Sequence, residues 1–172
     1  VEAGGTVSVL GSKVEAAGNA TLKAGRGLVV GATRDVSSDA GSSRRSTRSA
    51  YAERLQGSSV LSGGDVRLSG TDIGIEASRV SADGRLDVVA GNALSVAAGA
   101  QASRYASSST SKGRGLFSKK KTEHVNESRL TYESSVLSGG RAVSLDAGGD
   151  MEIAGSRIKS GGNVDITALG GL

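Results

Sequence analysis

The residues best suited to contact a partner lie in one short stretch, KGRGLFSKKK, at residues 112–121. Its cations and its apolar pair are Lys112, Arg114, Leu116, Phe117, Lys119, Lys120 and Lys121. Clustered cations attract anionic lipid headgroups, and an exposed apolar pair can enter a membrane interface. The stretch therefore predicts contact with a membrane or another partner, although a solvated loop tip often has a similar composition.

A second, weaker basic patch is SSRRSTR, which contains Arg44, Arg45 and Arg48. Nucleic acid also attracts basic patches electrostatically. Neither stretch offers an aromatic platform for bases or a recognised nucleic-acid motif. We therefore expect no nucleic-acid partner.

Carboxylates raise a different possibility, because a suitably spaced pair can perform acid–base work on a glycosidic bond. The candidates are Asp65, Asp72, Asp87, Asp146, Asp150 and Asp165. Most fall at outward strand positions or in turns, where solubility explains them, and nothing in the sequence brings them together. The chain has one histidine, His124, and no cysteine, which argues against a transition-metal site. We expect no enzyme activity, metal or cofactor, and keep a carbohydrate-active lyase or hydrolase as the alternative.

The elements that must position these residues are short strands. The chain has 172 residues, with 27 Gly, no Pro, no Trp, one Phe and three Tyr, so its core must be built from Val, Leu, Ile and Ala. Apolar residues alternate, as at Val7 and Val9 or at Val164 and Ile166, and small turn-forming residues follow them. Period two predicts strands with one buried face.

One block of sequence occurs three times without gaps, at residues 6–25, 72–91 and 150–169. Its equivalent positions are Val7, Ile73 and Met151; Val9, Ile75 and Ile153; Val14, Val80 and Ile158; and Leu22, Val88 and Ile166. A recurring unit of this kind is typical of repeat architectures.

A finer period of about 20–22 residues lies inside these blocks. Val60 recurs as Val80, and Val136 recurs twenty-two residues later as Ile158. Each coil holds three short strands, which can bury their apolar faces only by stacking on the next coil. The pattern predicts an all-β fold, a right-handed parallel β-helix, in preference to an antiparallel sandwich.

Two insertions, 33–57 and 99–133, interrupt the coils at matching places, and each leads into a copy of SSVLSGG. They carry twelve basic and six acidic residues, whereas the rest of the chain carries nine basic and eleven acidic residues. Insertions in repeat proteins map to loops on one face, often the binding face. We expect residues 1–172 to form a single β-helical segment with two extended loops or hairpins.

The phrases GSKVEAAGNATLKA and GSRIKSGGNVDITA resemble the haemagglutinin repeats of filamentous haemagglutinin and of contact-dependent growth inhibition effectors. The loop SKGRGLFSKKK is similar to loops between such repeats. The resemblance covers essentially the whole chain. It implies a bacterial exoprotein exported by two-partner secretion, located outside the cell or on its surface.

The resemblance also implies a role and partners. The segment would be a stalk or contact surface in adhesion, or would help to deliver a C-terminal toxin to a target cell. Its partners would be the outer-membrane secretion partner of the parent and the target-cell envelope, through lipid, glycan or an outer-membrane protein. The chain starts at Val1 and ends within the repeat pattern. We therefore expect an excised piece of a longer protein, whose exposed ends could associate end to end.

Overall fold

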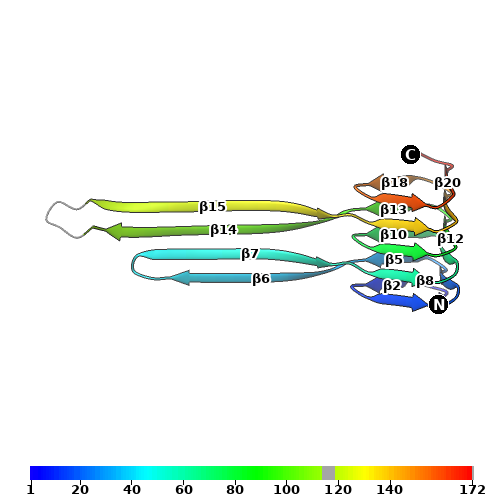
Figure 1. Cartoon of the computed structure of the whole chain (residues 1–172), viewed down its shortest axis with the longest axis horizontal. Helices are drawn as coiled ribbons and strands as arrows, with labels where there is room; N and C mark the ends of the chain where they lie inside the picture. Colours follow the sequence, from blue (N-terminus) through cyan, green and yellow to red (C-terminus); the bar gives the residue numbers. More distant parts are fainter. Residues whose placement is uncertain (114–118, 172) are drawn as a thin grey trace. The chain divides into compact units, whose positions relative to one another are not determined.

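All regular structure in the described part of the chain is β-strand. The computed structural model describes residues 1–113 and 119–171, and its elements are the strands labelled β1 to β20 in Figure 1. Contacts divide the chain into two compact units. The β-helix unit comprises Val1–Thr33, Leu55–Gly99 and Tyr132–Leu172, and the hairpin unit comprises Arg34–Arg54 and Ala100–Thr131. Across the described ranges, no helix has the length and apolar character needed to cross a membrane.

Three parallel sheets make up the β-helix unit. The first sheet contains β1 (Glu2–Ala3), β4 (Ala20–Ala24), β9 (Val66–Gly70), β12 (Arg85–Ala90), β17 (Ala142–Ala147) and β20 (Asn163–Ala168). The second contains β2 (Val7–Leu10), β5 (Gly27–Gly31), β10 (Asp72–Glu76), β13 (Leu94–Ala97) and β18 (Met151–Ala154). The third contains β3 (Lys13–Ala16), β8 (Ser59–Ser62), β11 (Arg79–Ala82), β16 (Val136–Gly139) and β19 (Arg157–Ser160).

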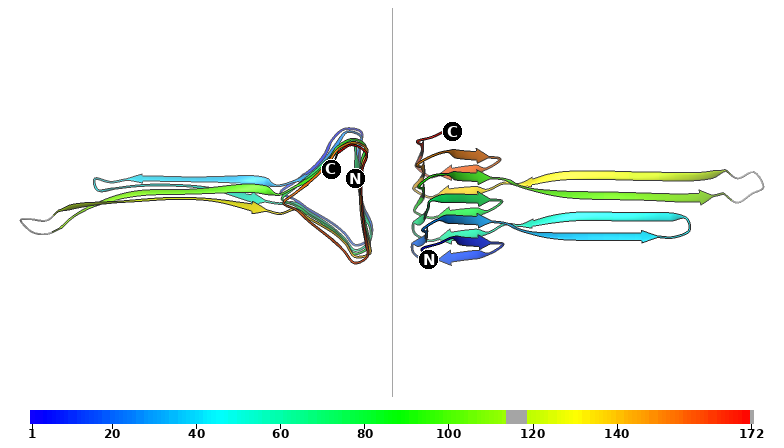
Figure 2. Two further views of the ribbon diagram at one scale, coloured as in Figure 1. Left: turned by 90° about the horizontal axis from the view of Figure 1, so that it is seen from above. Right: turned by 180° about the vertical axis from the view of Figure 1, so that it is seen from behind.

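The chain visits these sheets in turn, so each coil contributes one strand to each sheet and pairs in parallel with the coils above and below. Seen along its axis, this unit has a triangular outline (Figure 2). The predicted parallel β-helix is therefore confirmed.

Inward side chains from successive coils stack in columns. One column of the second sheet consists of Val7, Leu28, Ile73, Leu94 and Met151. One column of the first sheet consists of Leu22, Leu68, Val88, Leu145 and Ile166. Aliphatic residues in the middle coils are fully buried, among them Leu28, Leu68, Val88 and Leu145. A narrow interior of this kind explains why the core lacks large aromatic side chains.

The second copy of SSVLSGG lies one residue out of step with the first. Val80 pairs with Val60 in one neighbouring coil, as predicted, but with Leu137 in the other. The predicted pairing of Val136 with Ile158 is wrong, because Val136 pairs with Arg157 and Leu137 pairs with Ile158. A slip of one residue exchanges the two faces of a strand. Val60 and Leu137 are accordingly buried, whereas Leu61 and Val136 point outward and are partly exposed.

A serine precedes every strand of the third sheet, and these serines form a ladder at the corner that follows the second sheet. The backbone N–H of Ser12 donates to Ser58 Oγ at 3.2 Å, that of Ser58 to Ser78 Oγ at 3.0 Å, and that of Ser78 to Ser135 Oγ at 3.3 Å. Ser58, Ser78 and Ser135 are buried. Their hydroxyls also bond to carbonyls of the second sheet, as Ser135 Oγ does to Ala97 O at 2.6 Å. The ladder satisfies backbone groups that the corner would otherwise leave unpaired.

This corner is closed in two different ways. In three coils a single residue with positive φ precedes the serine: Gly11 (φ 53°), Ala77 (φ 47°) and Gly155 (φ 59°). In the other two coils the chain instead leaves for a hairpin, which ends at Gly57 in the first case and Ser134 in the second. Both hairpins are therefore inserted at the same corner of the coil.

The hairpin unit is a four-stranded sheet in the order β15-β14-β7-β6. Its strands are β6 (Thr33–Ser42), β7 (Ser46–Gln56), β14 (Gly99–Lys112) and β15 (Lys120–Glu133). β7 and β14 pair antiparallel, from Ala52 opposite Ser103 to Ser46 opposite Ser109, and this pairing joins the two hairpins (Figure 1).

Candidate interaction surface

The two faces of the hairpin sheet differ in charge. Directly opposed residues share a face of an antiparallel sheet, and alternate residues of a strand point to opposite faces. Tyr51 lies opposite Arg104, whereas Ala50 lies opposite Tyr105. The side-chain contact between Thr110 and Thr122 places the even-numbered residues of β14 and β15 on one face. We name the two sides the Tyr51 face and the Tyr105 face.

Ion pairs extend this assignment to β6. Arg34 pairs with Glu53 at 3.3 Å and so lies on the Tyr51 face, whereas Asp39 pairs with Arg48 at 2.6 Å and lies on the Tyr105 face. The Tyr105 face carries acids and bases together: Asp35, Asp39, Glu123 and Glu127 with Arg48, Arg54, Lys121 and Arg129. On the Tyr51 face the cations are Arg34, Arg104, Lys112 and Lys120, and among the described residues the acid is Glu53. The Tyr51 face is therefore the more positive of the two.

Glu53 is held by a network that spans both hairpins. Its Oε1 accepts hydrogen bonds from the Tyr51 hydroxyl at 2.7 Å and from Arg34 at 3.3 Å, and its Oε2 accepts one from the Ala102 N–H at 3.1 Å. Arg34 also donates to Ala100 O at 3.3 Å. The hydrogen bond from Tyr51, followed by that from Ala102, lowers the pKa of Glu53, while the hydrogen bond to Glu53 raises the pKa of Tyr51. The Glu53 side chain is only 15% exposed, so its charge is largely used within the sheet.

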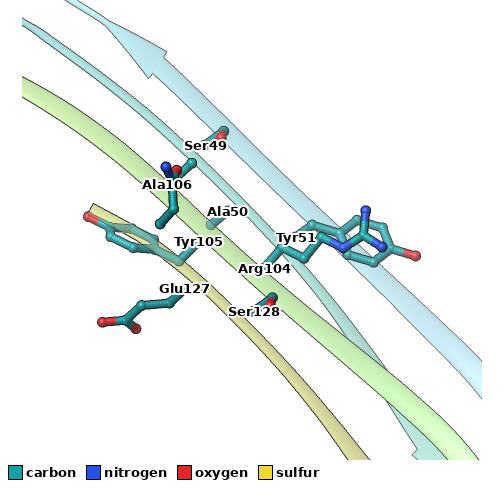
Figure 3. Close-up of a pocket in the computed structure, with 9 residues that line it drawn as sticks. Ser49, Ala50, Tyr51, Arg104, Tyr105, Ala106, Glu127 and Ser128 are labelled. Carbon is teal, nitrogen blue, oxygen red and sulfur yellow. The ribbon is translucent and has the colours of Figure 1, made fainter. Parts of the chain in front are cut away.

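Two adjoining depressions mark the Tyr51 face. The larger one, about 430 Å³, is lined by residues 49–51 of β7, 104–106 of β14 and 126–128 of β15. Of these, the alternate residues have side chains on the Tyr51 face: Ser49, Tyr51, Arg104, Ala106, Asn126 and Ser128. The smaller one, about 180 Å³, continues along the same strands to Thr47, Ser108 and His124 and shares the wall of Ser49, Ala106 and Asn126. Figure 3 shows the larger depression, with Tyr51 and Arg104 extending to the side away from Tyr105 and Glu127.

The residues of the predicted basic stretch are only partly described. Lys112 ends β14, Lys120 and Lys121 begin β15, and Lys119 immediately precedes that strand; all four are exposed. Arg114, Leu116 and Phe117 lie outside the described residues. We call Lys112, Lys119, Lys120 and Lys121 the lysine end of the sheet.

The structure brings the second basic patch close to the lysine end. Arg44 and Arg45 lie in the turn between β6 and β7, and the Thr110 N–H donates to Arg45 O at 2.7 Å, two residues before Lys112. Arg48 differs from the other two because its guanidinium is paired with Asp39. The two basic stretches thus belong to one surface, although they lie far apart in the sequence.

Three of the six candidate carboxylates of the β-helix unit bind the backbone. Asp65, Asp72 and Asp150 each accept a hydrogen bond from a backbone N–H of an adjacent coil, namely that of Arg85, Ala93 or Gly171. Asp87, Asp146 and Asp165 lie on the outer side of the first sheet, where Asp87, by its hydrogen bond and then its charge, raises the pKa of Arg85. His124 stands on the Tyr51 face. Among the described residues, no cluster of three or more His, Cys, Asp or Glu could hold a metal ion.

Comparison with known proteins defines the class of the chain. It belongs to the hemagglutinin repeat family, whose model matches residues 39–172. This match, together with the relatives below, confirms the resemblance to the repeats of filamentous haemagglutinin and of contact-dependent growth inhibition effectors. No solved structure matches the chain.

Two curated relatives are similar over part of the chain. The 16S rRNA endonuclease CdiA of Enterobacter cloacae subsp. cloacae is 28% identical over 116 residues, or 67% of this chain and 4% of that protein. The tRNA nuclease CdiA of Escherichia coli strain STEC_O31 is 30% identical over 92 residues, or 54% of this chain and 3% of that protein. The chain thus spans only a few per cent of the length of either relative.

Sequence reasoning missed the Tyr51 face. Its residues come from both insertions, and their meeting depends on the pairing of β7 with β14. The available signal in the sequence was a weak alternation of side-chain types. It places Tyr51 two residues before Glu53 in the first insertion, and Arg104 among small residues in the second.

Proposed function

We propose that the chain is a structural and interaction segment of a secreted bacterial exoprotein. It acts as a cell-surface stalk, either in adhesion or in the delivery of a contact-dependent growth inhibition toxin to target cells. The observation that carries this proposal is the match to the hemagglutinin repeat family over a β-helix with continuous aliphatic columns. Each coil adds about 4.8 Å of length, so repeated coils make a long and regular spacer.

The relatives support a role in the spacer of a larger protein. Both are named as nucleases, and this chain aligns with only 4% of one and 3% of the other. We assign the nuclease activity to other regions of such proteins, and assign to this segment the work of extending reach and presenting the hairpins. Export through an outer-membrane secretion partner and a location on the cell surface belong to the same proposal.

The lysine end is the part of the segment that we expect to meet the target envelope. Its four described cations are exposed, and the turn at Arg44 and Arg45 adds to the same surface. Each basic residue near an anionic membrane surface contributes about 1 kcal/mol of attraction. The joint substitution of Lys119, Lys120 and Lys121 by Ser should therefore weaken binding of the chain to phosphatidylglycerol vesicles by at least tenfold.

A matched control removes the same charge elsewhere. Lys13, Lys23 and Lys159 are exposed residues of the β-helix unit, and their joint substitution by Ser changes the net charge equally. If both triple variants bind vesicles equally well, the lysine end has no special role and the segment is a stalk with inert hairpins.

The test of the stalk role uses the full-length parent in a cell that secretes it. Both hairpins are replaced by the Glu76-Ala77-Ser78 corner, which closes the same position in the middle coil. We expect the variant to be displayed on the cell surface as before, which protease accessibility measures. Attachment or toxin delivery should fall. Unchanged attachment and delivery would contradict the contact role. Unchanged display and delivery after removal of residues 1–172 would contradict the stalk role.

A further inference from the structure

We propose that the Tyr51 face is a binding surface for a carboxylated polysaccharide, such as a chain that contains hexuronic acid. The adjoining depressions on this face form one trough, which crosses β7, β14 and β15 over an array of nine side chains. They are Thr47, Ser49, Tyr51, Arg104, Ala106, Ser108, His124, Asn126 and Ser128. Lys112 and Lys120 of the lysine end lie on the same face, but none of the four lysines lines the trough.

Arg104 provides the recognition of a carboxylate. It is exposed, and within the described residues it takes part in no salt bridge, unlike Arg34 and Arg48. A guanidinium presents parallel N–H donors that fit the two oxygens of a planar carboxylate. The Arg104 charge therefore remains available to a ligand.

Tyr51 is the neighbour of Arg104 on this face. The two residues lie opposite each other on β7 and β14, so their side chains share the Tyr51 face. The Tyr51 hydroxyl is fixed by Glu53, whose carboxylate is itself held by Arg34 and the Ala102 N–H. A tyrosine ring held in this way supplies an apolar wall beside the Arg104 guanidinium.

The rest of the trough fits sugar hydroxyls. Thr47, Ser49, Ser108 and Ser128 provide hydroxyls, and Asn126 provides an amide that both donates and accepts hydrogen bonds. Arg48 also lines the smaller depression, but its guanidinium is paired with Asp39. Arg104 is therefore the guanidinium that the trough offers to a ligand, and a sugar with one carboxylate matches it better than a densely sulfated chain, which needs a cluster of cations. Glu127 belongs to the lining of the larger depression, but its carboxylate points to the opposite face, away from Tyr51 and Arg104 (Figure 3).

The first test uses the complete 172-residue chain and changes only the ligand. Trigalacturonate should bind measurably by isothermal titration calorimetry, and its fully methyl-esterified form should bind at least tenfold more weakly, because the ester removes the charge that Arg104 recognises. Equal binding of the acid and the ester, or no binding of the acid, would overturn the proposal. This comparison needs no variant, so a folding defect cannot obscure its result.

The second test changes the protein. Arg104→Gln should reduce trigalacturonate affinity about tenfold or more, and Arg104→Lys should restore only part of it, because lysine keeps the charge but loses the fork. Arg129→Gln on the opposite face is the matched control and should change affinity less than twofold. Equal losses in the Arg104→Gln and Arg129→Gln variants would reduce the effect to net charge and overturn the proposal.

A lipid surface is the competing occupant. Phosphatidylglycerol vesicles should not displace trigalacturonate, and Arg104→Gln should leave vesicle binding unchanged. Displacement by vesicles together with loss of vesicle binding in Arg104→Gln would assign the face to a membrane instead. The inference shares one assumption with the proposed function, namely that the hairpins contact a foreign surface. The binding tests with purified chain can fail while the stalk test in cells succeeds. The stalk test can equally fail while trigalacturonate binds the purified chain.

Discussion

Val60 and Leu137 occupy the same column of the β-helix, one on each side of Val80, although they are not equivalent in the repeated string SSVLSGG. The string aligns Val60 with Val136 and Leu61 with Leu137. The fold uses the first copy with its valine inward and the second with its leucine inward. The apolar column therefore decides the register, and local sequence identity does not.

This relationship predicts opposite sensitivities in the two copies. Val60→Ala and Leu137→Ala should each lower the free energy of unfolding, by about 1–2 and 2–5 kcal/mol respectively, because each leaves a cavity in the buried column. Leu61→Ala and Val136→Ala should each cost less than about 1 kcal/mol, because both side chains point outward. Chemical denaturation of the four variants measures this. A large loss for Val136→Ala with a small loss for Leu137→Ala would show that the register is wrong.

The serine ladder predicts a cost for removing one buried hydroxyl. Ser135→Ala should reduce the free energy of unfolding by about 1–3 kcal/mol, because the Ser78 N–H and the Ala97 carbonyl both lose the Ser135 hydroxyl as a partner. Ser134→Ala, at the exposed neighbouring position, should change it by less than about 0.5 kcal/mol. Equal effects in the two variants would mean that the hydroxyl of Ser135 does not support the corner.

Two glycines predict opposite outcomes for the same substitution. A Cβ at position 57 would lie 1.9 Å from Ala77 O, whereas a Cβ at position 74 would meet no atom within 4 Å. Gly57→Ala should therefore lower the free energy of unfolding by about 2 kcal/mol or more, which a clear fall in the thermal midpoint would show. Gly74→Ala, in strand β10, should leave it unchanged or raise it slightly. Gly57 lies where the chain returns from the first hairpin, and it packs against Ala77 at the corner of the next coil. An unchanged midpoint in Gly57→Ala would contradict this close packing.

The Tyr51–Glu53 hydrogen bond predicts a change in tyrosine titration. Because the carboxylate raises the pKa of Tyr51 above the ordinary value of 10.0, Glu53→Gln should bring that pKa down. Tyr105→Phe and Tyr132→Phe in the background leave Tyr51 as the tyrosine that titrates, and tyrosinate ultraviolet absorbance measures it. An unchanged titration curve would show that the hydrogen bond is absent in solution.

The same pair predicts how stability depends on pH. The pKa of Glu53 is lowered in the fold, so its stabilisation is present above the usual value of 4.5 and is lost as the pH falls through the lower folded value. The pKa of Tyr51 is raised, so its stabilisation is present below 10.0 and is lost as the pH rises through the folded value. Amide protection in β7 and β14 should therefore weaken at both extremes, and Glu53→Gln should remove the acid limb.

The coils could be predicted from the sequence because alternation and a period near twenty residues both express one physical requirement, the burial of inward aliphatic side chains. Val66 and Leu68 stack on Leu86 and Val88 as their spacing predicts. The shifted second copy could not be read in the same way. Its seven residues are identical to the first, and only the continuation through Arg141 and Ala142 to the buried Val143 fixes which side chain turns inward.

The candidate surface was less accessible to sequence reasoning. Basic composition pointed to Lys112 and Lys120, and both are exposed near the end of the hairpin sheet. The pairing of Tyr51 with Arg104 joins residues from two insertions, and the sequence alone does not show which strands of separate insertions will meet. Charge segregation between the faces follows from that pairing, so it also could not be anticipated.

The corner between the second and third sheets tolerates either a single residue with positive φ or an excursion of more than twenty residues, while the columns on both sides keep their stacking. The inserted hairpins can therefore change in evolution while the β-helix that carries them stays the same. New recognition loops can be acquired at Ala77 without rebuilding the rod, and the same position is a natural place to graft a foreign epitope for display.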